Sequence, residues 1–342
     1  MIHWNWKSLV SPSFREAKGD TRAELRCAII YAIAVVPVVA VLVARGWSPD
    51  ILAALILIPP WCWLLVGMGS LTVVFRAGRK RLAWLLILFW GLFAVTAVEQ
   101  FPGLLRLAMT RSRAAGEIRI VSLNCSNTPK CLADLHAVSP DLVLLQEAPG
   151  EDDAVQMARE LFGPAGSVLF GGDTAILARG SIEPRHVDRA GQFVSGTVTL
   201  SGGGPLECIS LRLSPPSPNV EFWTPAFWTS HRDCRVEHRR QLRAIADQIG
   251  PIARADAPFV IGGDFNTTPG DRSLLELPAA FRDAFRSSGV GLGGTGTNDW
   301  PLFRVDQIWL NGKLRPARTL AVKTIWSDHR MVVCDVEGDL RD

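Results

Sequence analysis

The chain has 342 residues, which is enough for one large domain and a further segment. Its net charge of +3 is unevenly spread, because residues 1–115 carry 13 Lys and Arg against 5 Asp and Glu, whereas residues 116–342 carry 23 against 28. The mildly acidic C-terminal part argues against binding to duplex nucleic acid, since affinity for a polyanion comes largely from clustered Lys and Arg.

The first 98 residues are predicted to form a membrane anchor. Residues 1–26 are polar and basic, and because they lack a small-residue cleavage pattern they are expected to be a cytoplasmic tail. Three runs without charge follow, at residues 27–44, 51–75 and 82–98. Each is close to the ~20 residues that a helix needs to cross ~30 Å of hydrocarbon, so we expect three transmembrane helices rather than buried core helices. Pro59-Pro60 should kink the second helix or make it restart.

The orientation follows from the basic residues in the two short loops. The second loop carries Arg76, Arg79, Lys80 and Arg81, and the first carries Arg45 and Asp50. Because basic loops stay on the cytoplasmic side, the N-terminus and the second loop are expected there. Three crossings then make the rest of the chain the extracytoplasmic part of a multi-pass cell-membrane protein that contacts membrane lipids. Residues 99–116 are expected to be a linker.

From residue 117 to 342, short strand-like runs alternate with helical ones, which is typical of an α/β or α+β domain. Strands are expected at residues 118–123, 142–145, 174–177, 193–200, 206–213, 259–261, 305–310, 319–325 and 331–336, and helices at residues 130–138 and 235–249. On the outer side of a membrane, Cys125 and Cys131 could close a short disulfide loop; buried free thiols are the simpler alternative.

Five strand ends carry polar side chains where a buried strand would simply stop. They present Asn124, Glu147, the pair Asp264 and Asn266, Asp306, and the pair Asp328 and His329. Such residues are poor strand formers or costly to bury unpaired, so their recurrence predicts one shared polar pocket. Gly262-Gly263 is expected to let the chain turn sharply and to present Asp264 and Asn266 on one face, although a turn without chemistry would have the same sequence.

The segments that contain these residues are Ser122–Asn124, Leu144–Glu147, Gly263–Asn266, Val305–Ile308 and Ser327–His329. In this order and at these spacings, over residues 117–337, the chain resembles the endonuclease/exonuclease/phosphatase superfamily. The resemblance implies an α+β fold, a four-layer α/β sandwich of two packed mixed β-sheets flanked by helices. It also implies a metal-dependent phosphoric ester hydrolase.

The resemblance implies a role for each residue, and the chemistry of the side chains supports it. Glu147 would hold a divalent cation, Mg²⁺ with Mn²⁺ as the alternative, because oxygen ligands suit a hard ion. Asn124 and Asp328 would complete this metal site. Asp264 would orient or deprotonate the attacking water, and Asn266 would hold a phosphate oxygen.

His329, protonated and paired with Asp306, would stabilise the charge that develops on the phosphorus oxygens. Simpler explanations exist for the same residues. Asp306 could instead pair with Arg304 or Arg330, and Glu147 could be a turn or capping carboxylate. The segment that ends at His329 could be a helix N-cap, but the run after it is strand-like.

Two features depart from the pattern of the superfamily. Arg212 stands at the strand end where many relatives carry a His, and an Arg there could bind a phosphate oxygen through two N–H groups. Residues 221–228 form an insertion with four aromatic residues, of which Trp223 and Trp228 would touch the membrane surface or a lipid chain of the substrate. A loop packed over the sheet edge is the alternative.

These features together predict a membrane-anchored, Mg²⁺-dependent phosphoesterase that hydrolyses a phosphate ester or diphosphate bond by in-line attack of an activated water. A lipid-linked phosphate suits the acidic domain and its aromatic insertion better than duplex nucleic acid. An extracytoplasmic nuclease is the first alternative. A membrane-tethered binding module that keeps the fold without turnover is the second. The sequence contains no feature from which a protein partner can be inferred.

Overall fold

The computed structural model describes residues 50–338, apart from 110, 189, 202 and 254–256, together with isolated positions between 25 and 43. The predicted tail at residues 1–26 and the predicted span at 27–44 lie outside the described residues, except for those isolated positions.

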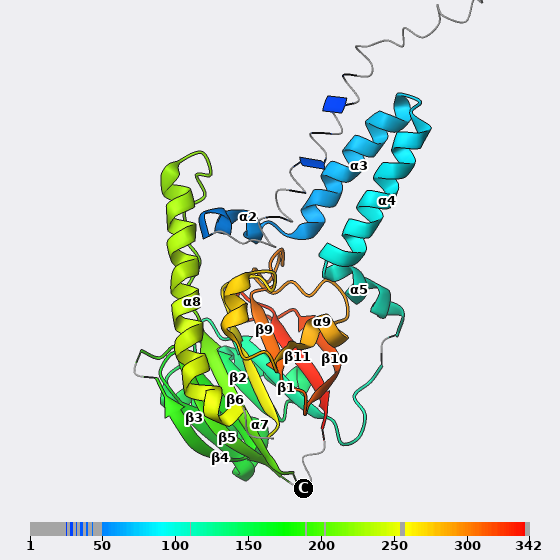
Figure 1. The fold of residues 1–342 in the computed structure, drawn as a ribbon. Helices are drawn as coiled ribbons and strands as arrows, with labels where there is room; N and C mark the ends of the chain where they lie inside the picture. The colour runs from blue at the N-terminus through cyan, green and yellow to red at the C-terminus, as the bar shows by residue number, and fades with distance from the viewer. Residues whose placement is uncertain are drawn as a thin grey trace, which may run out of the picture.

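The elements alternate along the chain as the sequence suggests (Figure 1). The helices are α2 (Ala53–Leu57), α3 (Pro60–Arg76), α4 (Lys80–Ala97), α5 (Gln100–Leu105), α6 (Leu132–Val138), α7 (Glu151–Phe162), α8 (Pro225–Ala253) and α9 (Ala284–Ser288). The strands are β1 (Ile118–Asn124), β2 (Leu142–Gln146), β3 (Gly166–Phe170), β4 (Thr174–Val187), β5 (Phe193–Leu200), β6 (Pro205–Arg212), β7 (Phe259–Asp264), β8 (Arg282–Asp283), β9 (Asp306–Leu310), β10 (Arg315–Val322) and β11 (Met331–Glu337).

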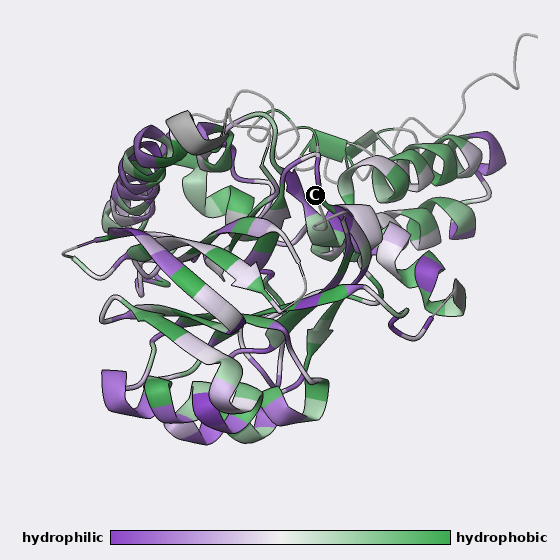
Figure 2. Ribbon diagram, turned by 90° about the horizontal axis from the view of Figure 1, so that it is seen from below, coloured by the Kyte–Doolittle hydropathy of each residue, from purple (hydrophilic) through white to green (hydrophobic). Residues whose placement is uncertain are grey.

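The strands form one mixed sheet of eleven strands that curls into two packed layers. The strand β4 belongs to both layers, because its first half pairs with β2 and β3 and its second half pairs with β5. It passes from one layer to the other at Gly180, where a Cβ atom would lie 2.0 Å from the carbonyl oxygen of Thr199. Figure 2 shows helices on the outer sides of two facing layers of strands, which confirms the predicted α+β sandwich.

Apolar side chains fill each interface of this sandwich. Between the two layers, Leu144 of β2 packs with Val260 of β7 and Ile308 of β9 in one cluster. A second cluster lies between the first layer and helices α6 and α7, and a third lies between the second layer and α8. Burial of this apolar surface, at ~25 cal/mol per Å², is the main stabilising term of the fold.

The glycines before Asp264 have a structural role different from the predicted one. Gly262 and Gly263 lie inside β7 and are not a turn. A Cβ atom at Gly262 would lie 2.5 Å from Leu144 Cδ1 in the facing layer, and one at Gly263 would lie 2.0 Å from the carbonyl oxygen of Leu211. The two positions therefore require glycine because the layers and strands approach closely there.

The predicted three-helix anchor is not supported by the described residues. Among them, only α4 is long and apolar enough to cross a membrane by itself, and α3 passes the same test only together with residues 50–56, from which it is bent by 69°. The run at residues 51–75 is thus two helices and not one continuous helix, because Pro59-Pro60 ends the first helix. Residues 53–56 are largely buried, and α2 packs against α8. Figure 1 shows α3 and α4 as a hairpin that projects from the α/β domain.

The segment predicted as a linker is partly helical and packed on the domain. Helix α5 lies within it, and its Gly103 carbonyl oxygen accepts a hydrogen bond of 2.9 Å from the backbone N–H of Gly291. Glu99, just before α5, forms an ion pair of 2.9 Å with the buried Arg304. Asp50, which lies before α2, forms an ion pair with Arg239 of α8. The segments before and after the hairpin are therefore both held to the domain.

Candidate active site

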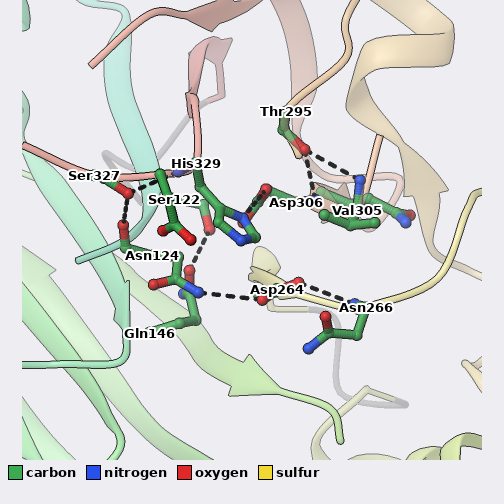
Figure 3. A network of polar contacts seen from close by, with 12 residues as sticks. Ser122, Asn124, Gln146, Asp264, Asn266, Thr295, Val305, Asp306, Ser327 and His329 are labelled. Atoms are coloured by element: carbon green, nitrogen blue, oxygen red, sulfur yellow. Dashed lines mark hydrogen bonds and ion pairs between the residues drawn. The ribbon is translucent and has the colours of Figure 1, made fainter. Parts of the chain in front are cut away.

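The centre of the candidate site is a trio of ionisable side chains, of which Asp264 and Asp306 are buried and His329 is half-buried (Figure 3). Asp264 ends β7 and lies opposite Asp306 in the antiparallel pairing with β9. His329, just before β11, donates through Nδ1 to Asp306 Oδ2 over 2.8 Å. The backbone N–H groups of Val305 and Asp306 both donate to Thr295 Oγ1, which fixes the start of β9. The predicted alternatives for Asp306 are wrong, because its partner is His329 and not Arg304 or Arg330.

Burial and mutual charge shift the pKa values of this trio. Burial, and next the negative charge of Asp306, raise the pKa of Asp264 to about 7. Burial alone would lower the pKa of His329, but the charge and hydrogen bond of Asp306, followed by the charge of Asp264, outweigh it and raise the pKa to about 10. At neutral pH His329 is therefore a cation, and Asp264 can take up or release a proton.

Asn124 connects this trio to the facing layer. It ends β1, and its Nδ2 donates to Glu147 Oε1 at 3.1 Å and to Asp264 Oδ2 at 3.2 Å. Glu147 follows β2 in the left-handed region, with φ of 44°. A left-handed glutamate is uncommon and costs about 1–3 kcal/mol, which is typical of residues whose side chain must point in one functional direction.

Arg212 is the residue whose environment differs most from the expectation. It is the last residue of β6 and lies opposite Asp264 in the parallel pairing with β7. This agrees with its predicted place at a strand end of the site. Its guanidinium is bound by two carboxylates, Glu147 Oε1 at 2.6 Å and Asp173 Oδ2 at 3.0 Å. Arg212 therefore orients Glu147, and it keeps some exposure for a further anion.

Asp328 and Asn266 lie at the site but already have partners. Asp328 is exposed and accepts a hydrogen bond of 2.5 Å from Ser126 Oγ, while Ser327 Oγ donates to the carbonyl oxygen of Asn124 over 2.6 Å. Asn266, left-handed with φ of 48°, donates through its backbone N–H to Asp264 Oδ1 and through Nδ2 to the carbonyl oxygen of Leu213. Its role as a phosphate ligand stays a prediction.

The two predicted aromatic contacts are not brought into this centre. Trp223 is 70% exposed, and its contact is an edge-on packing against Phe222. Trp228 lies on α8 rather than in a loop, because α8 begins at Pro225, and its Nε1 donates to the carbonyl oxygen of Phe222 over 3.0 Å. The predicted insertion is thus a short loop followed by the first turn of a long helix.

Several supporting residues were not predicted. Gln146, fully buried, donates to Ser210 Oγ across the two layers and accepts from Ser122 Oγ. In the sequence, Gln146 could have been noticed because it directly precedes Glu147. Nothing in the sequence marks Asp173 as a site residue, because its role depends on a contact with Arg212 that only the fold creates. Cys125 and Cys131 are buried thiols whose Sγ atoms lie 2.8 Å apart without a disulfide bond.

The donor set fits a hard divalent cation. Glu147, Asp264 and Asp306 offer carboxylate oxygens, and Asp306 Oδ1 is buried without a hydrogen-bond partner among the described residues. Asp264, Asp306 and His329 could together surround an ion. His329 could do so only after losing its proton, however, and its raised pKa opposes this. We therefore retain Glu147 as the principal predicted ligand, with Asn124 and Asp328 beside it.

Comparison with known proteins places this arrangement in a family. The sequence model of the Endonuclease/Exonuclease/phosphatase family matches residues 121–329, which is more than half of the chain. The mannosyl-6-phosphatase of Bacteroides thetaiotaomicron has a similar fold, with a TM-score of 0.50 at 15% identity over 64% of this chain and 99% of its own. A humanised TDP2 from D. rerio matches with a TM-score of 0.48 at 20% identity, over 65% of this chain and 99% of its own. No curated protein matches the sequence.

Proposed function

Because the chain belongs to the endonuclease/exonuclease/phosphatase family, whose members are metal-dependent phosphoesterases, we propose that it hydrolyses a phosphate ester or diphosphate bond by in-line attack of a water activated at Asp264. The observation that carries this proposal is the trio Asp264, Asp306 and His329 at the end of two paired strands. It places a base with a pKa of about 7 beside an imidazole whose pKa of about 10 keeps it cationic at neutral pH.

The residues divide the chemistry between them. Asp264, once ionised, accepts a proton from the water that it orients. His329 remains protonated and offers its Nε2 proton to an oxygen of the phosphate, where negative charge grows as the bond breaks. Asp306 holds the imidazole in this orientation and sustains its charge. No Ser or Cys nucleophile is needed, since positioning and electrostatics dominate phosphoryl transfer.

A divalent cation would be held by Glu147, with Asn124 and Asp328 beside it. Such an ion supplies positive charge to the phosphate and lowers the pKa of a bound water. Arg212, which contacts Glu147, keeps that carboxylate directed into the site. Mg²⁺ is the proposed ion and Mn²⁺ the alternative, because both accept oxygen ligands.

The proposal includes a membrane location and a lipid-linked substrate. Exposed apolar side chains flank His329: Ile325 and Trp326 lie just before it, and Trp300 lies in the loop whose Gly296 pairs with it. Helix α2, which precedes the hairpin, lies near the site as well, since the carbonyl oxygen of Ile56 accepts a hydrogen bond of 3.4 Å from Thr268 Oγ1, two residues after Asn266. Trp and Ile at this position suit a membrane surface.

The test uses the full chain in lipid nanodiscs with a panel of substrates. The panel holds a phospholipid, a polyprenyl diphosphate, single- and double-stranded DNA, and a soluble phosphate monoester. We expect Mg²⁺-dependent release of product from a lipid substrate and loss of this activity with EDTA. Hydrolysis of DNA alone would establish the nuclease alternative, and no metal-dependent turnover on any member would favour the non-catalytic binding module.

The orientation is tested separately. A phosphatase reporter and a fluorescent reporter are each fused after Asp342, because the first works only outside the cytoplasm and the second only inside it. An extracytoplasmic domain predicts an active phosphatase fusion. A fluorescent fusion with an inactive phosphatase would reverse the proposed topology.

A further inference from the structure

A cavity of about 620 Å³ lies where the helical hairpin meets the α/β domain, outside the catalytic trio. Its apolar wall includes Pro59 and Pro60 before α3 and Val95 and Val98 at the end of α4. Its opposite wall includes Thr268–Gly270, which follow the catalytic strand β7. The volume is in the range of small-molecule sites, about 300–1,000 Å³.

The polar part of the cavity is built on a buried charge network. Arg304, 3% exposed, forms ion pairs with Asp283 at 2.5 Å and with Glu99 at 2.9 Å, and all three residues line the cavity. These charges neutralise each other, so they form part of the wall and do not need a charged ligand as a partner. They also join the end of α4 rigidly to the domain.

Two further polar groups in the wall have no hydrogen-bond or ion-pair partner within the part of the chain that the structure describes. Gln100, 7% exposed, lines the cavity, and its Oε1 has no hydrogen-bond partner among the described residues. An unpaired buried acceptor costs about 1–3 kcal/mol, so a donor is expected there. Arg286, exposed on α9, also lines the cavity, and within the described part of the chain its guanidinium has no hydrogen bond or ion pair.

We propose that this cavity binds the head group of a membrane glycerophospholipid as a resident ligand, not as a substrate. Arg286 would bind the phosphodiester, and Gln100 Oε1 would accept a hydrogen bond from a head-group ammonium or hydroxyl. The acyl chains would follow the apolar surface of α4, the helix able to cross a membrane, whose last residues line the cavity. The cavity thus matches a lipid in both its polar and its apolar parts.

The predicted chemistry of the ligand is specific enough to separate lipid classes. Phosphatidylethanolamine offers an ammonium and phosphatidylglycerol offers hydroxyls, whereas phosphatidylcholine has the phosphodiester but no head-group donor for Gln100. The inference rests on the proposed membrane location of α4 but not on the proposed reaction. Binding without turnover would refute only the reaction, and turnover without binding would refute only this site.

The experiment counts bound lipid by native mass spectrometry on the full chain in detergent. The probes are dihexanoyl forms of the three lipids below their micelle concentrations. We expect one molecule of phosphatidylethanolamine or phosphatidylglycerol per chain, at concentrations where phosphatidylcholine is bound about tenfold less. Arg286→Gln should weaken all three by about tenfold, and Gln100→Leu should abolish the preference. Arg240→Gln, an exposed position on α8, is the matched control.

Equal occupancy by all three lipids in the unaltered chain would overturn the inference. So would an Arg286→Gln chain that binds as well as the Arg240→Gln control. Thermal unfolding of each variant shows whether it is folded, so that a loss of binding is assigned to the site. A preference for one of the two donor lipids over the other identifies which head group is the ligand, and supports the site in either case.

Discussion

His329 shows how one contact decides the chemistry of a residue. Its hydrogen bond to a fully buried carboxylate turns a side chain that titrates near neutrality into a cation with a pKa of about 10. Burial of Asp264, together with the charge of Asp306, raises the pKa of Asp264 to about 7. These two pKa values define the pH range in which both residues have the charge that the reaction needs.

The pH dependence of kcat should therefore be bell-shaped. Activity should rise as Asp264 loses its proton near pH 7 and fall as His329 loses its proton near pH 10. A bound cation would move the acid limb to lower pH, because positive charge favours the ionised carboxylate. Asp306→Asn should move the alkaline limb downward by removing the charge that sustains the imidazolium. An alkaline limb that does not move in this variant would show that another group causes it.

The same pKa shift has a consequence for stability. A folded-state pKa of about 10 lies above the unfolded value near 6.5, so the pairing of His329 contributes its full stability below about pH 6.5 and loses it as the pH rises through 10. The unaltered chain should lose more stability than Asp306→Asn between pH 7 and pH 10. Urea unfolding at several pH values measures this difference, and parallel curves for the two chains would contradict it.

Arg212 offers a test of how the metal site is tuned. Arg212→Gln removes the guanidinium that holds Glu147 Oε1 at 2.6 Å, so Glu147 should lose its orientation and bind Mg²⁺ about tenfold more weakly. Because the proposed binding of a phosphate oxygen by Arg212 is lost as well, kcat/KM should fall by a similar factor or more. Calorimetric titration of Mg²⁺ and steady-state kinetics give the two values. Tighter Mg²⁺ binding in the variant would contradict this role and would mean that the charge of Arg212 competes with the cation for Glu147.

At the scale of elements, the buried strands were predicted well because each carries its own pattern of apolar residues. The runs at β1, β2, β7 and β11 were found within a few residues. The second half of β4 was missed, because it is largely exposed and contains Arg, Glu and Pro. Helix α7 was missed too, although Gly150 and three acidic residues in the first turn mark its beginning.

The site was predicted in part, for a related reason. Polar residues at strand ends are visible in the sequence, and register then brings Asn124, Asp264 and Asp306 together. The double pairing of Arg212 and the pairing of Arg304 depend on side chains from distant segments. The sequence shows which polar residues are present, but it does not show which of them come into contact in the fold.

The close approach of the layers at Gly262 can be tested directly. Gly262→Ala would place a Cβ atom 2.5 Å from Leu144 Cδ1, so the layers must move apart or Leu144 must change its rotamer. We expect a loss of about 1–3 kcal/mol in the free energy of unfolding. Gly312→Ala, where a Cβ atom meets nothing within 4 Å, is the control. Equal stability of the two variants would contradict the packing argument.

At the scale of the whole molecule, the hairpin and the α/β domain are joined by buried charge. Arg304→Met removes the cation between Glu99 and Asp283. The carboxylate of Asp283, which is almost fully buried, then loses its positively charged partner. The variant should lose about 3–5 kcal/mol of stability. Arg243→Met, at an exposed ion pair, should lose less than about 1 kcal/mol. Chemical unfolding in nanodiscs compares them, and similar losses would show that the buried network does not hold the hairpin.

Helix α2, which precedes the hairpin, also lies next to the candidate site. Its Ala53 lines the same small cavity as Asn266, so this helix lies beside the loop that follows Asp264.

The most direct test of the account compares the full chain with its Asp264→Asn variant, in Mg²⁺, on the best substrate of the panel. The variant keeps the shape of the side chain and removes the base. The account predicts a fall in kcat of about 10²–10⁴-fold, with folding and Mg²⁺ binding retained. A variant that keeps kcat within tenfold of the unaltered chain would contradict the assignment of Asp264 as the group that activates water.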